Sequence, residues 1–458
     1  MNQCNVVILA AGQGKRMHSV LPKVLNPIAG KPMLQHVVET ARQLSPVRLV
    51  VVYGHGGKAV RQAIPGEDID WVLQDKQLGT GHAVKEALPS LDERFPILVL
   101  YGDVPLIRRE TLENLVRERD QESLGLLTAE AANPRGYGRV ARDGEGKIKA
   151  IIEEKDATEI ERGIREINTG IMLIPASHAK TWLWGLKDDN AQGEYYLTDL
   201  VAAANQAGVP VYAMQPGEFQ ETEGANDKAQ LAALERYYQL RQANALLVAG
   251  VHLFDPARLD VRGSLVCGQS VSIDVGCVFA GEVALGDNVS IGPYCVIRNA
   301  LIEAGAKIAA FTHIDGARIG AESVIGPYAR LRPGTVIGSC AHVGNFVEIK
   351  NTRLGEGSKA NHLSYLGDAE IGAAVNVGAG VITCNYDGAN KHTTIIQDRA
   401  FIGSDCQLVA PVTVGEGATI GAGTTLRRNA PAESLTIMKE RAQVALPDWQ
   451  KPNKTDAE

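Results

Sequence analysis

Hydrophobic and polar residues alternate in short blocks through the first half of the chain. Near-continuous apolar runs predict strands buried on both faces at Asn5–Ala10, Arg48–Val52 and Ile97–Tyr101. Between them, Met33–Leu44 and Gly81–Leu91 carry apolar residues at helical spacing. This order of strand and helix predicts an α/β layer with a mainly parallel sheet. Ligands of such sheets bind beyond the carboxyl ends of the strands, so site residues are expected there.

A long helix is predicted near the middle of the chain, over Asn226–Val248. It starts with Asn-Asp, contains no Gly or Pro, and is followed by Gly250. We interpret it as the connector between two halves, although one more helix of the first domain fits almost as well. The expected division is a first domain over residues 1–226, a helical linker over 227–250 and a second domain over 251–458.

Beyond the linker the period of apolar residues becomes six, which is neither the helical spacing nor plain strand alternation. A period of six indicates a hexapeptide repeat, in which three short strands form one triangular coil with the aliphatic residue pointing inward. Glycine often follows the aliphatic residue and suits the corners of such a coil. The residues in register are Ile319, Ile325, Leu331, Ile337, Val343 and Ile349, then Ile402, Leu408, Val414, Ile420 and Leu426.

Composition and charge narrow the range of functions and partners that this chain can have. The chain has 46 basic and 53 acidic residues, a net charge of −7, which disfavours non-specific nucleic-acid binding. Its seven cysteines form no CxxC pair and predict reduced thiols. No leader peptide or membrane span is expected, so we expect a cytoplasmic protein without a membrane or nucleic-acid partner.

A glycine-rich motif leaves the first predicted strand as LAAGQGKRM and is followed by LPK. Gly12 and Gly14 allow backbone N–H groups to approach phosphate oxygens, and Arg16 and Lys23 can neutralise a pyrophosphate leaving group. A dinucleotide fingerprint requires a third glycine where Met17 stands, and the GK[ST] of a P-loop is missing. The motif therefore favours a nucleoside triphosphate site, with a purely structural turn as the alternative.

The motif LAAGQGKRM…LPK resembles the signature of sugar-phosphate nucleotidyltransferases. With the hexapeptide half, the chain resembles the bacterial bifunctional N-acetylglucosamine-1-phosphate uridyltransferase and glucosamine-1-phosphate N-acetyltransferase family over roughly residues 5–440. The resemblance implies a Rossmann-like α/β nucleotidyltransferase, a linker helix and a left-handed parallel β-helix. It further implies Mg²⁺, a homotrimer, and the small-molecule substrates UTP, acetyl-CoA, glucosamine 1-phosphate and N-acetylglucosamine 1-phosphate. The product, UDP-N-acetylglucosamine, would feed peptidoglycan and lipopolysaccharide synthesis.

In the first domain, the resemblance implies catalytic roles for Arg16 and Lys23 and Mg²⁺ ligands at Asp103 and Asn226. Asp103 follows a predicted strand, where a metal ligand is expected, although it could instead cap the next helix. Asn226 could also cap a helix, a role that is compatible with metal binding. The amide of Gln74, beside a Leu-Gly-Thr-Gly turn, would read the uracil edge. The residues implied to bind UTP or the UDP-sugar are Leu9, Ala10, Ala11, Gly12, Lys23, Gln74, Gly79, Thr80, Tyr101, Gly102, Asp103, Gly138, Glu153, Asn168 and Asn226.

In the second domain, the six-residue register breaks at 354–366 and at 383–394, and function in a solenoid tends to lie at such breaks. His362 in the first break is the candidate general base for acetyl transfer, with an ordinary surface histidine as the alternative. The resemblance implies sugar-phosphate binding by Arg332, Lys350, Tyr365 and Asn376. It implies acetyl-CoA binding by Ala379, Asn385, Tyr386, Ser404, Ala422 and Lys439.

Lys439 departs from the family pattern, which commonly has arginine at this position. Lysine keeps the charge but lacks the bidentate fork of a guanidinium group. Two other functions stay open at this point. The first is a single-site nucleotidyltransferase whose β-helix only supports oligomerisation, and the second is a non-catalytic sensor of sugar nucleotides.

Overall fold

The computed structural model describes residues 3–12, 14–54, 56–117 and 122–439. The chain forms two compact units, Met1–Tyr238 and Gln239–Glu458. The boundary between these units lies within helix α8 (Lys228–Val248), the helix predicted as the linker. No helix in the described ranges combines the length and the apolar character that crossing a bilayer requires.

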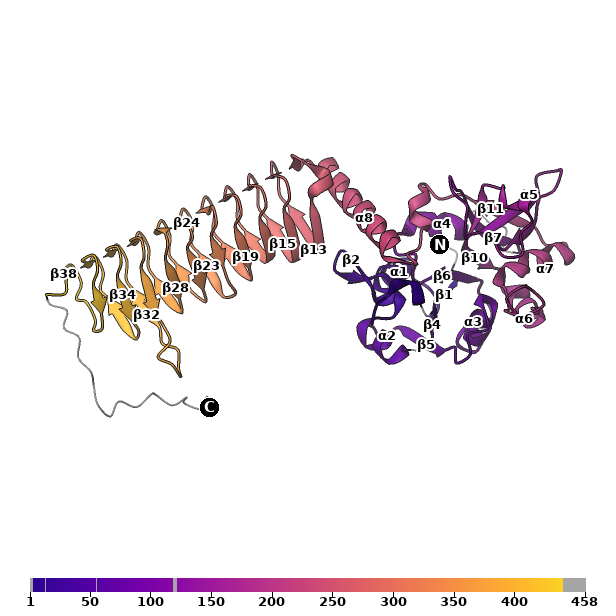
Figure 1. The fold of residues 1–458 in the computed structure, drawn as a ribbon, viewed down its shortest axis with the longest axis horizontal. Helices are drawn as coiled ribbons and strands as arrows, with labels where there is room; N and C mark the ends of the chain where they lie inside the picture. The colour runs from indigo at the N-terminus through magenta and orange to yellow at the C-terminus, as the bar shows by residue number, and fades with distance from the viewer. Residues whose placement is uncertain (1–2, 13, 55, 118–121, 440–458) are drawn as a thin grey trace. The chain divides into compact units, whose positions relative to one another are not determined.

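The first unit is built on one mixed sheet whose central strands are parallel (Figure 1). The strands predicted around residues 5–10, 48–52 and 97–101 are confirmed, and they pair in the order β6-β1-β4. One strand, β10, runs antiparallel to both neighbours. In order across the sheet the strands are β11 (Val211–Met214), β7 (Leu124–Glu130), β10 (Glu166–Ile174), β6 (Ile97–Tyr101), β1 (Asn5–Ala10), β4 (Leu49–Tyr53) and β5 (Ile69–Leu73).

Helices cover both faces of this sheet, which explains why its central strands are apolar on both sides. Val6 and Ile8 of β1 pack in a core with residues of α1, α2 and α4, whereas Val7 and Leu9 pack with residues of α3, α6 and α7. The helices are α1 (Met33–Arg42), α2 (Gly57–Ala63), α3 (Thr80–Ala87), α4 (Arg109–Arg117), α5 (Glu159–Arg162), α6 (Ala176–Gly185) and α7 (Leu200–Gln206). Short pairs of strands are β2 (Pro27–Ile28) with β3 (Lys31–Pro32), and β8 (Gly138–Arg142) with β9 (Ile148–Ile152).

The second unit is a stack of triangular coils, a parallel β-helix consistent with the left-handed type expected (Figure 1). Each strand pairs in parallel with the strand one coil along, as Ile308 pairs with Ile325. The first face contains β12 (His252–Leu253), β14 (Ser272–Ile273), β16 (Ser290–Ile291), β18 (Lys307–Ile308), β21 (Val324–Ile325), β24 (His342–Asn345), β27 (Lys359–His362), β30 (Asn376–Val377), β33 (Phe401–Ile402), β36 (Thr419–Ile420) and β38 (Leu435–Thr436).

The other two faces are joined through long strands at the start of the stack. The second face contains β19 (His313–Asp315), β22 (Arg330–Leu331), β25 (Glu348–Lys350), β28 (Tyr365–Gly367), β31 (Ile382–Cys384), β34 (Gln407–Val409) and β37 (Thr425–Leu426). The third face contains β20 (Ala317–Ile319), β23 (Thr335–Ile337), β26 (Arg353–Leu354), β29 (Ala369–Ile371), β32 (Thr394–Ile396) and β35 (Val412–Val414). The long strands are β13 (Asp260–Cys267), β15 (Val278–Leu285) and β17 (Val296–Ile302).

The six-residue register places aliphatic side chains inside the coils, as predicted, and every register residue named above is buried. Several glycines lie at the corners in the left-handed conformation, as expected, among them Gly326 and Gly334, and others have a second role. A Cβ added at Gly338 would lie 2.6 Å from the backbone nitrogen of Glu356, in the next coil. These glycines therefore permit close stacking of coils. The corners themselves are often turned by other residues in the left-handed conformation, such as Phe311 and Tyr328.

The corner between the first and second faces carries a ladder of stacked rings. Neighbouring rings lie 5.0–5.4 Å apart, and each ring is about half exposed. The aromatic corner is formed by Tyr294, Phe311, Tyr328 and Phe346, and Leu363 occupies the same corner one coil further on.

The end of α8 closes the first coil of the β-helix. The buried amide of Gln239 donates to the carbonyl oxygen of Val261 at 3.0 Å and accepts from its N–H at 2.7 Å. Ala243 is fully buried in the β-helix core. The helix thereby satisfies backbone groups that an uncovered coil would leave without partners.

We expect Ile337→Ala to destabilise the β-helix by about 2–5 kcal/mol, because the side chain is 1% exposed and its loss leaves a cavity. Val336→Ala is the matched control, since the neighbouring side chain is 37% exposed on the same strand. Calorimetry and circular dichroism during heating should show a clearly lower transition for Ile337→Ala only. Equal shifts for both variants would contradict the inward register.

Candidate functional site

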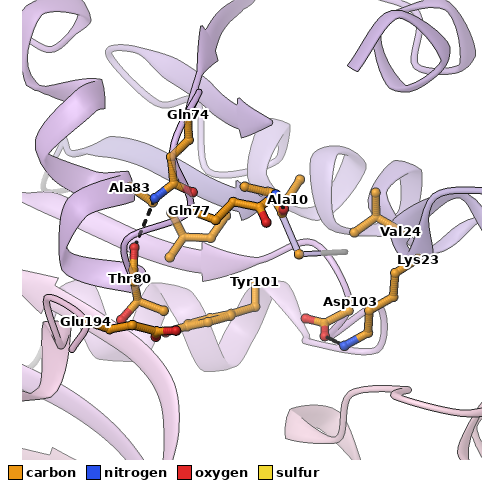
Figure 2. Close-up of a pocket in the computed structure, with 14 residues that line it drawn as sticks. Ala10, Lys23, Val24, Gln74, Gln77, Thr80, Ala83, Tyr101, Asp103 and Glu194 are labelled. Atoms are coloured by element: carbon orange, nitrogen blue, oxygen red, sulfur yellow. Dashed lines mark hydrogen bonds and ion pairs between the residues drawn. The ribbon is translucent and has the colours of Figure 1, made fainter. Parts of the chain in front are cut away.

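A cavity of about 240 Å³ lies at the carboxyl ends of β1, β5 and β6, where the sequence placed the site (Figure 2). Most residues expected to bind the nucleotide line this cavity. They are Leu9, Ala10, Ala11, Gly12, Lys23, Gln74, Gly79, Thr80, Tyr101 and Asp103. The sequence did not indicate four further lining residues, which are Val24, Gln77, Ala83 and Glu194.

The glycine-rich segment is held by contacts from elsewhere in the sheet. Gln77 donates from Nε2 to the carbonyl oxygen of Ala11 at 2.6 Å, and Gly102 donates to that of Leu9 at 2.9 Å. A Cβ added at Gly54 would lie 2.7 Å from Gln77 Nε2 and 2.8 Å from the carbonyl oxygen of Ala11. Only glycine fits there, because the loop and the Gln77 amide meet at this point.

Gln74 is buried, with a 3% exposed surface, and its amide orientation is determined by the protein. Its Nε2 lies 3.1 Å from the carbonyl oxygen of Gly79 and 3.1 Å from Nδ1 of His82. The amide nitrogen is thus engaged by protein acceptors. The amide oxygen is the group that Gln74 can offer to the N–H of a ligand.

Lys23, Asp103 and Asn226 form a polar cluster at one end of the cavity (Figure 2 shows Lys23 and Asp103). The ammonium of Lys23 pairs with the Asp103 carboxylate and lies 2.7 Å from Oδ1 of Asn226. The helix-capping alternative for Asn226 does not hold, because Asp227 accepts from the N–H of Gln230 at the start of α8.

Two oxygen donors from Asp103 and Asn226 therefore converge on one cation. This donor set fits Mg²⁺, which takes oxygen ligands and usually keeps only one or two protein ligands beside phosphate oxygens and water. Among the described residues, no group of three His, Cys, Asp or Glu side chains could hold a metal ion. A divalent ion here would accordingly share its coordination between these two residues and a phosphate substrate.

Gly138, Glu153 and Asn168 gather beside Tyr101. Gly138 pairs with Asn168 across β8 and β10, and Glu153 accepts from the Thr198 hydroxyl at 3.0 Å. Burial raises the pKa of Glu153, and so do the nearby acidic side chains. Burial and the charges of Glu153 and Asp103 raise the pKa of Tyr101.

Arg16 and Gly102 were also expected at the nucleotide site, but neither residue lines the cavity. Arg16 is exposed on the short helix η1 (Lys15–Met17). Gly102 acts through its backbone, which holds the end of β1.

In the second unit, His362 lies in one column with three of the expected acetyl-CoA residues. Backbone hydrogen bonds join successive coils at this corner, from Gly380 to His362, from Asp405 to Ala379 and from Gly423 to Ser404. His362, Ala379, Ser404 and Ala422 therefore occupy equivalent positions in successive coils. This column follows directly on the aromatic corner, where Gly380 takes the place held by Leu363 one coil before.

Basic residues gather at the opposite edge of the second face. Arg332 donates to the carboxylate of Glu348 at 2.8 Å, and Lys350 is the register partner of Gly367. Tyr365 begins β28, and its hydroxyl leans along the strand toward Gly367. Arg332, Lys350 and Tyr365 thus share one face.

The second break in the register, residues 383–394, forms an extruded loop (Figure 1) that adds a residue the sequence did not single out. Lys391 lies so close to Lys350 that the second ammonium lowers the pKa of Lys391. Two adjacent ammonium groups form a site for a doubly charged anion such as a phosphate monoester. The position of Lys391 within a charged, register-breaking loop was the signal available in the sequence.

Of the remaining expected residues, Asn385 lies near this pair, because at the base of the loop it bonds to Asp368, whose pKa the charges of Lys350 and Lys391 lower. Asn376 is on the first face, where it pairs with Lys359 and Phe401, so it does not share a face with Arg332 and Lys350. Tyr386 is 59% exposed on the loop, and Lys439, also exposed, ends the described chain.

Comparison with known proteins gives the family of this chain. The MobA-like NTP transferase domain matches residues 6–249, the GMPPB C-terminal domain matches 261–356, and the bacterial transferase hexapeptide (six repeats) matches 393–428. The bifunctional protein GlmU of Cupriavidus pinatubonensis is 59% identical over 450 residues, covering 98% of this chain and 99% of that protein. The GlmU proteins of Ralstonia pickettii and Burkholderia multivorans are each 58% identical and cover at least 98% of this chain.

The extruded loop contains an acid-resistant carboxylate, which gives a prediction. Asp387 accepts from the N–H groups of Asn390 and Ala389 and lies 2.7 Å from His392 Nε2, and these bonds lower its pKa to about 2. Because the pKa of Asp387 is depressed in the folded loop, its contribution to stability should be complete above pH 3.8 and be lost progressively as the pH falls from 3.8 to about 2, where the folded carboxylate takes up its proton. Carboxyl NMR, assigned by comparison with Asp387→Asn, should show this midpoint. A midpoint near 3.8 would contradict the loop geometry.

Proposed function

The chain belongs to the GlmU family of bifunctional enzymes, which carry both a uridylyltransferase and an acetyltransferase activity, and on that premise we propose which residues carry each reaction. The second unit acetylates glucosamine 1-phosphate with acetyl-CoA. The first unit transfers UMP from UTP to the resulting N-acetylglucosamine 1-phosphate, giving UDP-N-acetylglucosamine and pyrophosphate. This assignment is supported by the cavity of the first unit, which most of the expected nucleotide-binding residues line, and by the column of the second unit, in which His362 aligns with three of the expected acetyl-CoA residues.

In the uridylyl reaction, a phosphate oxygen of the sugar attacks the α-phosphorus of UTP, and the bond to the β-phosphate breaks. The nucleophile needs no general base, because a phosphate monoester with a second pKa near ~6 is already largely ionised at neutral pH. Gln74 and Gly79 recognise the base, and the segment Leu9–Gly12 receives the phosphates through backbone groups. Glu153, Asn168 and Gly138 bind the sugar beside Tyr101.

Charge neutralisation completes this step. Lys23 and Arg16 bind the phosphates and stabilise the pyrophosphate as it leaves. Asp103 and Asn226 hold Mg²⁺, which when bound neutralises phosphate charge and orients the triphosphate. On binding of nucleotide and metal, the Lys23 ammonium exchanges its contact with Asp103 for one with phosphate oxygens.

In the acetyl reaction, the amine of glucosamine 1-phosphate attacks the thioester carbon of acetyl-CoA and the carbon–sulfur bond breaks. His362 takes the proton from the attacking nitrogen, since imidazole titrates near neutral pH. The column of Ala379, Ser404 and Ala422 lies along the same corner and carries acetyl-CoA. Asn385 and Tyr386 contact acetyl-CoA from the loop, and Lys439 binds the phosphate end of the coenzyme.

The width of the second face suits the acceptor sugar. The corner with His362 bounds one edge, and Arg332, Lys350 and Lys391 gather at the other. A strand rises ~3.3 Å per residue, so these edges are separated by roughly 10 Å, the scale of a sugar phosphate. Tyr365 lies between the edges, and Asn376 contributes from the first face.

A homotrimer accounts for two features of the β-helix. The aromatic corner leaves half of each ring exposed along several coils, which favours contact with another copy. Asn376 and the pair Arg332–Lys350 lie on different faces, so packing of neighbouring copies supplies the residues of one acceptor site from two faces. We place the protein in the cytoplasm, where UTP and acetyl-CoA are available to it for peptidoglycan and lipopolysaccharide precursors.

The two activities should separate by mutation. Arg16→Ala should lower uridylyl transfer by orders of magnitude through loss of transition-state charge stabilisation, and His362→Ala should do the same to acetyl transfer. Each variant should keep the other activity. The assays are pyrophosphate release from UTP and thiol release from acetyl-CoA with glucosamine 1-phosphate. Pyrophosphate formation without any thiol release in the wild-type chain would instead establish a single-site nucleotidyltransferase.

The metal role of Asp103 can be measured without turnover. In the presence of UTP, Asp103→Ala should weaken Mn²⁺ binding at least tenfold, because the single carboxylate of the donor set is removed. Electron paramagnetic resonance of free Mn²⁺ gives the affinity, and Asp75→Ala is the control, as its side chain does not line the cavity. Unchanged Mn²⁺ affinity in Asp103→Ala would exclude this ligand.

A further inference from the structure

His362 has a hydrogen-bond partner that its place in the sequence does not reveal. Nδ1 of His362 lies 3.0 Å from Oδ1 of Asn345, a residue seventeen positions earlier. The two residues are register partners on β24 and β27, neighbouring strands of the first face. The contact therefore joins adjacent coils of the stack.

The backbone between these strands brings the two side chains together. A Cβ added at Gly344 would lie 2.0 Å from the carbonyl oxygen of Asn361, so only glycine allows this separation of the coils. Gly344 and Asn361 immediately precede Asn345 and His362. The close approach thus sets the distance between the amide and the imidazole.

An amide oxygen can only accept a hydrogen bond, so this geometry assigns the proton of the neutral ring to Nδ1. The other ring nitrogen, Nε2, then carries the lone pair. The tautomer of a catalytic histidine is commonly set in this way by the partner of its second nitrogen. A neutral amide orients the ring without adding the charge that a carboxylate would bring.

We propose that Asn345 is a positioning residue for acetyl transfer, whose amide oxygen holds His362 in the tautomer that takes the amine proton on Nε2. The proposal rests on the role of His362 as the base. In the step itself, the amine nitrogen forms its bond to the acetyl carbon, the carbon–sulfur bond breaks, and the proton passes from nitrogen to Nε2. Asn345 exchanges no proton and touches neither substrate.

The charged surroundings of His362 determine how a substitution should act. His342 on β24 and Lys359 on β27 are the other titratable residues of the two strands, β30 contributes none, and Tyr365 follows beyond the corner. The neighbours on these strands are thus cationic or neutral. Across the corner, Glu348 on β25 is the register partner of Tyr365, and its carboxylate is already paired with Arg332. A carboxylate at position 345 would introduce a negative charge beside the imidazole and stabilise its protonated form.

The test measures acetyl transfer by the full chain with Asn345→Ala, Asn345→Asp and His362→Ala. Asn345→Ala should lower kcat roughly 10- to 100-fold, a part of the contribution of a general base, with KM for either substrate changed less than about threefold. Asn345→Asp should recover most of kcat, with the ascending limb of the pH–kcat/KM profile moved upward by about one pH unit. Uridylyl transfer should be unchanged in all three variants.

Asn361→Ala is the matched control, since it removes an amide of the same size from the residue next to His362 on the same strand. It should keep kcat and the pH profile, which separates orientation of the base from disturbance of the strand. Wild-type kcat in Asn345→Ala overturns the proposal, and so does an equal loss in the Ala and Asp variants without a displaced pH profile. Acetyl transfer that survives His362→Ala overturns the assignment of the base itself, which distinguishes the two failures.

Discussion

The hydrogen-bond ladder between neighbouring coils is the constraint on which the acetyl-transfer unit depends. Each coil donates to the next, as in the bonds from Lys359 to Val375 at 2.8 Å and from Tyr365 to Val381 at 3.0 Å. The ladder makes register partners of residues such as Asn345 and His362, which are seventeen positions apart in the sequence. Residues at equivalent positions of successive coils are therefore aligned in columns, and His362 belongs to one such column.

In the uridylyl unit, the site residues are positioned differently, by loops at the carboxyl ends of parallel strands. These loops need support from other elements, as Gln77 and Gly54 provide for the backbone at Ala11. The charges of this site are also supported by a neighbouring group. Lys23 pairs with Asp103 in a partly buried position, where an unpaired charge of either residue would destabilise the fold. The lysine that we propose to bind phosphate is thus already paired with the two residues that we propose to bind the metal.

Much of the fold followed from pattern alone. Three central strands, two helices, the linker helix and the inward aliphatic register were all expected from spacing and are present. The antiparallel direction of β10 was not expected, because a local run of apolar residues does not indicate whether a strand runs parallel or antiparallel to its neighbour. Glycines were expected at the corners and several are found there, but the close approach of Gly338 to Glu356 in the next coil was not expected, because no local rule describes a contact between coils. Gln77 and Lys391 were missed for the same reason.

The sequence by itself determined the two architectures, the nucleotide motif and the identity of the candidate base, because period, glycine placement and residue chemistry are local properties. The tertiary structure alone decided which residues meet. It paired Lys23 with Asp103 and Asn226, set Lys391 beside Lys350, and placed Asn345 against His362. It also separated Asn376 from Arg332 by a corner. The physical reason is that these contacts depend on strand order and coil stacking, which are properties of the whole packed chain.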